Sequence, residues 1–317
     1  MYKLRLVSLL LLVVFLPVDG LAQPSVTLEQ AQSFIDTGMQ ALAPVLDQAK
    51  RGNVEANIIT EKDVPYQQSQ GVDPARLSLD LYTTGEKINS PCKPLLLYIH
   101  GGGWLGGDKA LALFKPAEFV PSGYVFASAN YRFRPDASLL EMVQSVADAV
   151  GWLHREAPKH GADPNRIFLM GHSAGAHLVS VLGTNPDFLD RAGVPMAAIR
   201  GVISLDTAAY DLPALAASSP FHGMLFGGLQ STWSEVSPLD QIPNNPAKTP
   251  FLVFFSEGRS EAATQTRPFV EKLQLAGYPA FLYEALGRNH QQLDTRIGTP
   301  GDESTQRIQD FLKEFSH

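Results

Sequence analysis

A serine between two glycines is the strongest chemical feature of the sequence: residues 171–175 read Gly-His-Ser-Ala-Gly. The apolar run 167–170 before it predicts a buried strand, and the apolar residues from 177 onward are spaced as in a helix. Glycines permit the sharp strand-to-helix turn that exposes a serine hydroxyl, and a helix N-terminus directs N–H groups at developing negative charge. We therefore predict Ser173 as an acyl-transfer nucleophile rather than part of an ordinary turn.

A second glycine-rich segment, residues 100–104 with the sequence His-Gly-Gly-Gly-Trp, follows another apolar run. Three consecutive glycines leave backbone N–H groups open to a ligand, and the oxyanion of a tetrahedral intermediate needs two or three such donors. We predict Gly102 and Gly103 as two donors, with Ala174 as the third. A phosphate-binding loop is disfavoured because no Gly-Lys-Ser/Thr follows.

Together these motifs resemble the α/β-hydrolase superfamily, in particular the esterases and lipases with an HGGGW oxyanion motif. That group includes hormone-sensitive-lipase-like, bacterial feruloyl-esterase-like and kynurenine-formamidase-like enzymes. Three further segments occur in the family's order: 79–82 (Leu-Asp-Leu-Tyr), 130–132 (Asn-Tyr-Arg) and 161–167 (Gly-Ala-Asp-Pro-Asn-Arg-Ile). The resemblance covers about residues 75–315. Ala176 departs from it, since many relatives carry a second glycine there.

The resemblance implies a triad in the chain order serine, acid, histidine. Of the eight histidines, only His290 follows a late strand-like run, 280–283, through a turn at 287–289, whereas His317 is terminal. We therefore predict His290 as the base that takes the proton of Ser173 and returns it to the leaving group.

The acid has three candidates. Relatives usually carry Asp three residues after the glycine that follows the strand at 251–255, and this position is Glu261. Glu261 is the predicted acid, because a carboxylate need only orient the imidazole and stabilise its cation. Asp206, at the end of the preceding strand, is an alternative because some lipases place the acid there. Glu257 is the other alternative.

The predicted elements alternate between strand and helix. Continuous apolar runs indicate strands buried on both faces at 94–99, 124–129, 167–170, 202–205 and 251–255. Helical spacing is present at 139–153, at 177–182, at 268–275 between Pro268 and Gly277, and after a cap at Asp302. This alternation predicts an α/β fold with a mostly parallel central sheet and helices on both faces.

We expect one catalytic domain at 76–317, with an outer strand at 76–82 that has one wet face. Residues 23–75 form a lead-in that contains a helix over 27–49, interrupted at Pro44. The segment 207–247 has few long apolar runs and several Pro and Gly residues, and it is expected to be a small cap insertion over the strand ends. Its Phe221, Leu225 and Phe226, together with Trp104, are expected to shape the substrate pocket.

Residues 1–22 have the pattern of a secretory signal peptide, with Lys3 and Arg5 before an apolar run and a small-residue cleavage site at Ala22. We expect a secreted or periplasmic protein without stable membrane insertion after cleavage; an uncleaved anchor is the alternative. Cys92 is the only cysteine, so no internal disulfide forms, and its turn-like setting does not favour a catalytic thiol.

The formal net charge of −7 disfavours a nucleic-acid partner. His172 and His177 lack the support of a metal site, so we expect neither metal nor cofactor. His100, Arg132 and Asp148 are interpreted as structural. The oligomeric state stays open.

The expected activity is hydrolysis of small or medium acyl esters through an acyl-enzyme. An amide or formamide hydrolase would use the same residues. A binding module without catalysis and a true lipase are further alternatives, and the lipase is disfavoured by the modest apolar content of 207–247.

Overall fold

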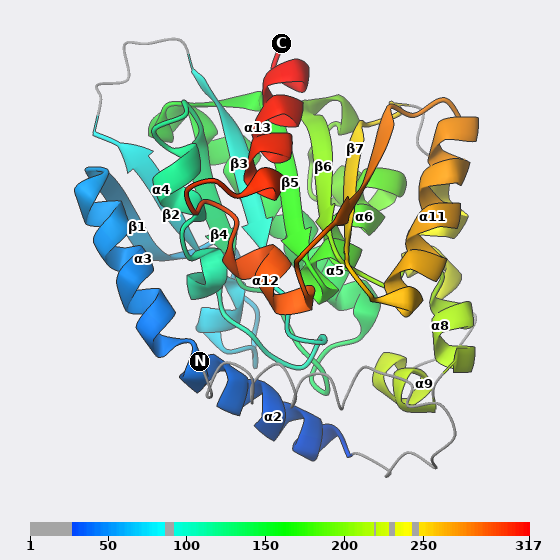
Figure 1. Ribbon diagram of the computed structural model, residues 1–317. Coiled ribbons are helices and arrows are strands. Elements are labelled where there is room, and N and C mark those ends of the chain that lie inside the picture. The colour runs from blue at the N-terminus through cyan, green and yellow to red at the C-terminus, as the bar shows by residue number, and fades with distance from the viewer. Residues whose placement is uncertain (1–26, 86–91, 219, 228–231, 243–246) are drawn as a thin grey trace.

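The computed structural model describes residues 27–85, 92–218, 220–227, 232–242 and 247–317; the expected signal peptide 1–22 lies outside these ranges. The described strands form one eight-stranded sheet in the order β1-β2-β4-β3-β5-β6-β7-β8 (Figure 1). Strand β2 is antiparallel to β1 and β4, and the other pairs are parallel. The bounds are β1 Ile58–Pro65, β2 Ser78–Thr84, β3 Lys93–Ile99, β4 Val125–Ala129, β5 Ala162–His172, β6 Ile199–Leu205, β7 Phe251–Ser256 and β8 Ala280–Ala285.

Helices cover both faces of the sheet. One face packs against α5 Leu139–Glu156, α6 Ala174–Thr184 and α11 Ser260–Leu275. The other packs against α4 Lys115–Phe119, α12 His290–Thr295 and α13 Glu303–Phe315. The remaining α-helices are α2 Leu28–Ala41, α3 Ala43–Glu55, α7 Asp187–Arg191, α8 Leu212–Ser218, α9 Pro220–Phe226 and α10 Pro238–Gln241. Short 3₁₀ turns lie at Pro74–Leu77, Lys109–Ala112, Ala157–His160, Met196–Ala198 and Ser234–Val236.

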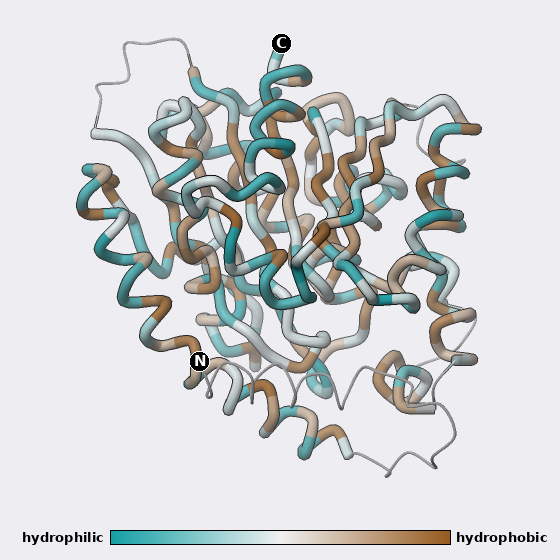
Figure 2. Tube along the Cα trace, in the orientation of Figure 1, coloured by the Kyte–Doolittle hydropathy of each residue, from teal (hydrophilic) through white to brown (hydrophobic). Residues whose placement is uncertain are grey.

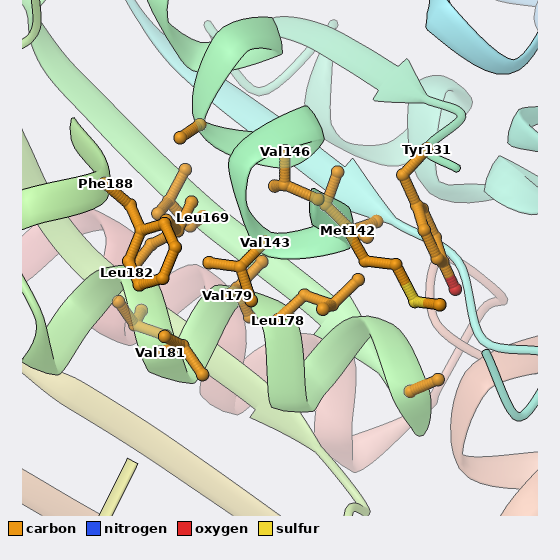
Figure 3. Close-up of a cluster of buried hydrophobic side chains, with 14 of the residues drawn as sticks. Tyr131, Met142, Val143, Val146, Leu169, Leu178, Val179, Val181, Leu182 and Phe188 are labelled. Carbon is orange, nitrogen blue, oxygen red and sulfur yellow. The ribbon is translucent and has the colours of Figure 1, made fainter. Parts of the chain in front are cut away.

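The alternation of side chains along β3 explains why its run is apolar throughout. Leu95, Leu97 and Ile99 belong to the core on the α5 and α6 face, whereas Leu96 and Tyr98 belong to the core on the α12 and α13 face. Figure 3 shows part of the first core, where Val143 and Val146 of α5 lie beside Leu178 and Val179 of α6. Both faces of the sheet are buried, as the continuous runs predict.

Three local expectations need correction or refinement. Strand β2 is not an outer strand with one wet face, because β1 pairs beyond it and Ser78 and Asp80 are buried. Helix α11 begins at Ser260 and contains Pro268 in its interior, whereas Pro268 was predicted near its start. The N-terminal helix is interrupted as expected: α2 ends at Ala41 and Pro44 lies in the first turn of α3.

Hydrophobic and hydrophilic residues alternate along α2 and α3, while most of α13 is hydrophilic on its visible side (Figure 2). The apolar stripe of α2 includes the buried residues Ala31 and Ile35, so this helix packs one face on the domain. Within the part of the chain that the structure describes, no helix has the length and apolar character needed to cross a bilayer.

Candidate functional site

Ser173 lies at a sharp turn between β5 and α6. Its backbone is held at φ 56° and ψ −118°, a conformation that non-glycine residues rarely adopt, and its N–H donates to the carbonyl of Leu205 at 2.9 Å. A Cβ on Gly171 would lie 2.4 Å from the carbonyl oxygen of Gly175, and a Cβ on Gly175 would lie 2.2 Å from that of Ile99. The two glycines are therefore required by close backbone packing.

His290 joins Ser173 to a carboxylate. Its Nε2 lies 3.1 Å from Oγ of Ser173, and its Nδ1 lies 2.8 Å from Oδ2 of Asp206. His290 is the first residue of α12, which is capped by the side chain of Asn289. Asp206 directly follows β6, and Ser173 directly follows β5. The three side chains meet because parallel strands bring their carboxyl ends to one edge of the sheet.

Asp206 is fully buried and has several polar partners. Oγ of Ser256 donates to Oδ2 at 2.5 Å, and Nη1 of Arg259 forms an ion pair with Oδ1 at 3.1 Å and donates to the backbone carbonyl at 2.8 Å. Burial alone would raise the pKa of this carboxyl, but Arg259 and the bonds from His290 and Ser256 hold its pKa far below the ordinary value. Asp206 is therefore an anion at neutral pH.

The prediction that Glu261 contacts the imidazole is wrong. Nδ1 of His290 is bonded to Asp206, the alternative acid that follows the preceding strand, and no hydrogen bond joins Glu261 to His290 among the described residues. Because α11 begins at Ser260, Glu261 is in its first turn, and Arg259 is the residue of this loop that reaches His290. Glu257 accepts the N–H of Gly287 at 2.8 Å, which supports the turn before His290.

Burial and the nearby charge of Arg259 lower the pKa of His290 to about 4; His172 adds to this effect and Asp206 opposes it. Nη1 of Arg259 lies 2.9 Å from Nδ1 of His290. The imidazole is therefore neutral at pH 7. With its Nδ1 proton donated to Asp206, its Nε2 is free to accept a proton from the hydroxyl of Ser173.

The glycine loop after β3 is tightly folded beside Ser173. Gly102 has φ 134°, and a Cβ there would lie 2.0 Å from the carbonyl oxygen of Gly106. Among the described residues, the N–H groups of Gly102 and Gly103 have no hydrogen-bond partner. Ala174 is the first residue of α6, where an N–H has no intrahelical acceptor. The three predicted donors thus belong to the two backbone segments that flank the hydroxyl.

A cavity of about 70 Å³ opens at Ser173 and His290. It is also lined by the glycine loop, by Leu111, by the α12 residues Gln291, Asp294 and Thr295, and by residues of α2 and its C-terminus: Ile35, Gly38, Met39 and Leu42. No described residue of 207–247 lines it, so the expected role of this segment as the cap over the site is not supported. Helix α2, which lines the cavity, belongs to the lead-in.

Trp104 was expected to contact the substrate, but its indole is buried and does not line this cavity. Its Nε1 donates to Nδ1 of His177 at 3.2 Å, and its ring packs edge-on against Phe226. His177 in turn bonds to the carbonyl of Val236. Trp104 therefore joins the glycine loop to α6 and to the segment 207–247.

His100 is buried and stacks on Tyr131, and its Nδ1 lies 2.8 Å from the carbonyl oxygen of Gly101. Burial lowers its pKa to about 4, so it is a neutral structural group. Arg132 donates to Ser145 and to the carbonyl of Glu141, which anchors its loop to α5. No cluster of three or more His, Cys, Asp or Glu side chains in the described ranges could hold a metal ion.

The sequence did not indicate a buried ion pair between Lys115 and Asp294, which is a residue of α12. Nζ of Lys115 lies 2.8 Å from Oδ1 of Asp294, which also accepts the hydroxyl of Tyr98 at 2.8 Å. Nε2 of His172 lies 2.9 Å from the carbonyl oxygen of His290. These contacts fix the helix that carries His290. No spacing could have revealed them, because Lys115 and Asp294 are 179 residues apart.

Residues 79–202 match the model of the BD-FAE family. The methylesterase "Isoprenylcysteine alpha-carbonyl methylesterase ICME" of Arabidopsis thaliana is 32% identical over 34% of this chain and 25% of its own length. "Esterase LipQ" of Mycobacterium tuberculosis is 24% identical over 79% of this chain and 61% of its own length. The crystal structure of Esterase B from Lactobacillus Rhamnosis superposes with a TM-score of 0.68 at 21% identity, covering 90% of this chain and 96% of that one.

The chain has the α/β-hydrolase fold. It is esterase/lipase-like in sequence, as the resemblance of its motifs predicted. The matched region of the family includes the glycine loop and Ser173 but ends before Asp206 and His290. This chain spans about a quarter of the length of the methylesterase. The structure, and not the family match, therefore identifies Asp206 and His290 as neighbours of Ser173.

Proposed function

We propose that this protein is a serine carboxylic-ester hydrolase for small or medium acyl esters, with Ser173, His290 and Asp206 as its triad. The observation that carries the proposal is the continuous set of contacts from Oγ of Ser173 through the imidazole of His290 to the buried carboxylate of Asp206. Support also comes from similarity to proteins named as esterases, and from the likeness to a solved structure of Esterase B inhibited by a phosphonate.

In the proposed reaction, Oγ of Ser173 attacks the acyl carbon while its proton passes to Nε2 of His290. The negative charge on the former carbonyl oxygen is stabilised by the N–H groups of Gly102, Gly103 and Ala174. The carbon–oxygen bond to the alcohol then breaks, and the leaving oxygen takes the proton from Nε2. Water repeats the sequence on the acyl-enzyme, which releases the acid and restores the hydroxyl. Asp206 stabilises the imidazolium in both halves.

The experiment is hydrolysis of p-nitrophenyl acetate by the wild-type protein and by Ser173→Ala, together with labelling by a fluorescent alkyl phosphonate. We expect turnover and a label in the wild type and neither in the variant. Unchanged turnover in a folded Ser173→Ala variant would reject the proposal. A parallel assay with an N-formyl aryl amine distinguishes an ester hydrolase from an amide hydrolase, since the same residues can cut both bonds.

Export is part of the proposal and rests on the charge and hydropathy pattern of residues 1–22. Expression of the full chain in a bacterium with an outer membrane, followed by fractionation and mass measurement, tests it. The expected result is a periplasmic or secreted protein whose first residue is Gln23. Full-length protein in the cytoplasm would contradict it.

A further inference from the structure

The cavity at Ser173 has two chemically different walls. Helix α12 contributes His290, Gln291, Asp294 and Thr295, all of which carry polar groups. Helix α2 contributes Gly38 and the apolar side chains of Ile35 and Met39, and its C-cap residue contributes the side chain of Leu42. A bound ester therefore meets a polar surface on the side of the base and an apolar surface on the side of the N-terminal helix.

The chemistry of the proposed reaction orients the ester between these walls. The acyl carbon of the tetrahedral intermediate carries Oγ of Ser173, the oxyanion, the leaving oxygen and the acyl chain. The oxyanion must face the N–H groups of the glycine loop, and the leaving oxygen must face Nε2 of His290 to receive its proton. The leaving alcohol thus lies on the α12 side. The acyl chain is directed away from His290, and the side chains of α2 offer it an apolar surface in this cavity.

We propose that α2 is the acyl-binding wall of this enzyme and that Met39 and Leu42 limit the length of the acyl chain. The substrates are then esters of short, uncharged aliphatic acids. The inference rests on the proposed ester hydrolysis and adds to it the location of the acyl subsite. Neither the motif-bearing segment 79–202 nor the segment 207–247 supplies this wall.

The size of the cavity is the basis for the expected limit on acyl chain length. The cavity at Ser173 is small, with a volume of about 70 Å³. We therefore expect acetyl and butyryl chains to be accepted better than an octanoyl chain.

Contacts with the glycine loop hold α2 in position. A Cβ on Gly106 would lie 2.9 Å from both Nε2 of Gln32 and Cγ2 of Ile35, so the helix rests directly on the loop backbone. The N–H of Gly106 donates to the carbonyl of Gly102, which belongs to the predicted oxyanion hole. Ile35 therefore supports the loop as well as the cavity. Met39 and Leu42 are only partly buried, which makes them the better positions for a test.

The test measures kcat/KM for p-nitrophenyl acetate, butyrate, octanoate and laurate in the wild type, Met39→Ala and Leu42→Ala. The control is Met224→Ala, which removes the same side chain from the exposed surface of α9. Because each methylene in an apolar pocket changes the rate about tenfold or more, we expect the octanoate-to-acetate ratio to rise at least about tenfold in either cavity variant. In Met224→Ala this ratio should stay within about twofold of the wild-type ratio.

Met39→Phe provides the opposite change, since a larger ring narrows the cavity. It should lower the butyrate-to-acetate ratio, and melting temperatures of all variants establish that each is folded. An unchanged chain-length profile in folded Met39→Ala and Met39→Phe would overturn the inference, as would an equal shift in Met224→Ala. Loss of the proposed function looks different: the wild type would then hydrolyse no ester of the series, the acetate included.

Discussion

Oδ2 of Asp206 lies 2.8 Å from Nδ1 of His290, although the two residues are 84 positions apart and each follows a different strand. Asp206 has no solvent exposure, and Arg259 and Ser256 supply its other contacts. A buried carboxylate in this position fixes the tautomer of the imidazole, so that Nε2 faces the serine hydroxyl. The acid of the proposed triad is therefore Asp206, which follows β6, and not the predicted Glu261, which comes after β7.

This assignment makes Asp206→Asn and Glu261→Gln a matched pair. Asp206→Asn should lower kcat by about 10⁴-fold, because an amide cannot stabilise the imidazolium and favours the wrong tautomer. Glu261→Gln should retain kcat within about threefold, as expected for a residue outside the contacts of the triad. Steady-state kinetics with p-nitrophenyl acetate measure both. The reverse ranking of the two variants would restore Glu261 as the acid.

The pH dependence of kcat/KM should reflect the environment of His290. Its pKa is about 4, and only the neutral imidazole accepts the proton of Ser173, so activity should persist to about pH 5 and disappear as the pH falls through 4. Arg259→Gln removes a positive charge that disfavours the imidazolium, so the acid limb should move to higher pH by about one unit. Asp206 and His172 also face the imidazole and are unchanged in this variant.

Arg267→Gln is the control for this pH profile, since Arg267 is exposed on the same helix, α11, where it forms an ion pair with Glu284 and lies over the ring of Phe255. Its acid limb should coincide with that of the wild type. If the acid limb of Arg259→Gln stays in place or moves to lower pH, the interpretation that the charge of Arg259 lowers the pKa of His290 is contradicted.

Gly102→Ala tests the glycine loop. The new Cβ would meet the carbonyl oxygen of Gly106 at 2.0 Å, so the loop must shift and the predicted oxyanion donors with it. We expect kcat to fall about 10²–10³-fold. Gly71 also has a positive φ, 79°, but a Cβ there meets nothing within 4 Å. Gly71→Ala should therefore cost only about 1 kcal/mol of unfolding free energy, measured in urea, and leave kcat unchanged. Equal kinetic losses in both variants would argue against the oxyanion role.

The pair of Lys115 and Asp294 should be important for stability. Lys115 has no solvent exposure, and Lys115→Met would leave the buried carboxylate of Asp294 without its cation. We expect a loss of about 3–5 kcal/mol in the free energy of unfolding by urea. The double variant Lys115→Met, Asp294→Leu should be more stable than the single variant, because the buried charge is gone.

A surface ion pair gives the comparison. Lys50 and Asp47 are 3.4 Å apart and both largely exposed, so Lys50→Met should change stability by less than about 1 kcal/mol. A small loss for Lys115→Met, similar to that for Lys50→Met, would show that Asp294 is satisfied without its lysine.

Much of the local structure could be predicted from sequence because its causes are local. The apolar runs became the buried strands β3 to β7, and the predicted cap Asp302 accepts the N–H of Thr305 at the start of α13. The nucleophile turn was predictable for the same reason, since Gly171, Ser173 and Gly175 are separated by only a few bonds and meet through backbone sterics. The proximity of His290 to Ser173 could also be predicted, because His290 follows a late strand-like run, while its role as the base is part of the proposal.

The tertiary structure decided which distant groups share the site. Three carboxylates, Asp206, Glu257 and Glu261, follow the ends of neighbouring strands, and their order in the chain does not distinguish them. Only the start of α11 and the position of Arg259 establish that Asp206 contacts His290. The apolar wall from Met39 and Leu42 likewise depends on where α2 packs. Short-range sterics and hydropathy depend on residues that are neighbours in the sequence. Long-range contacts depend instead on the packing of the whole chain.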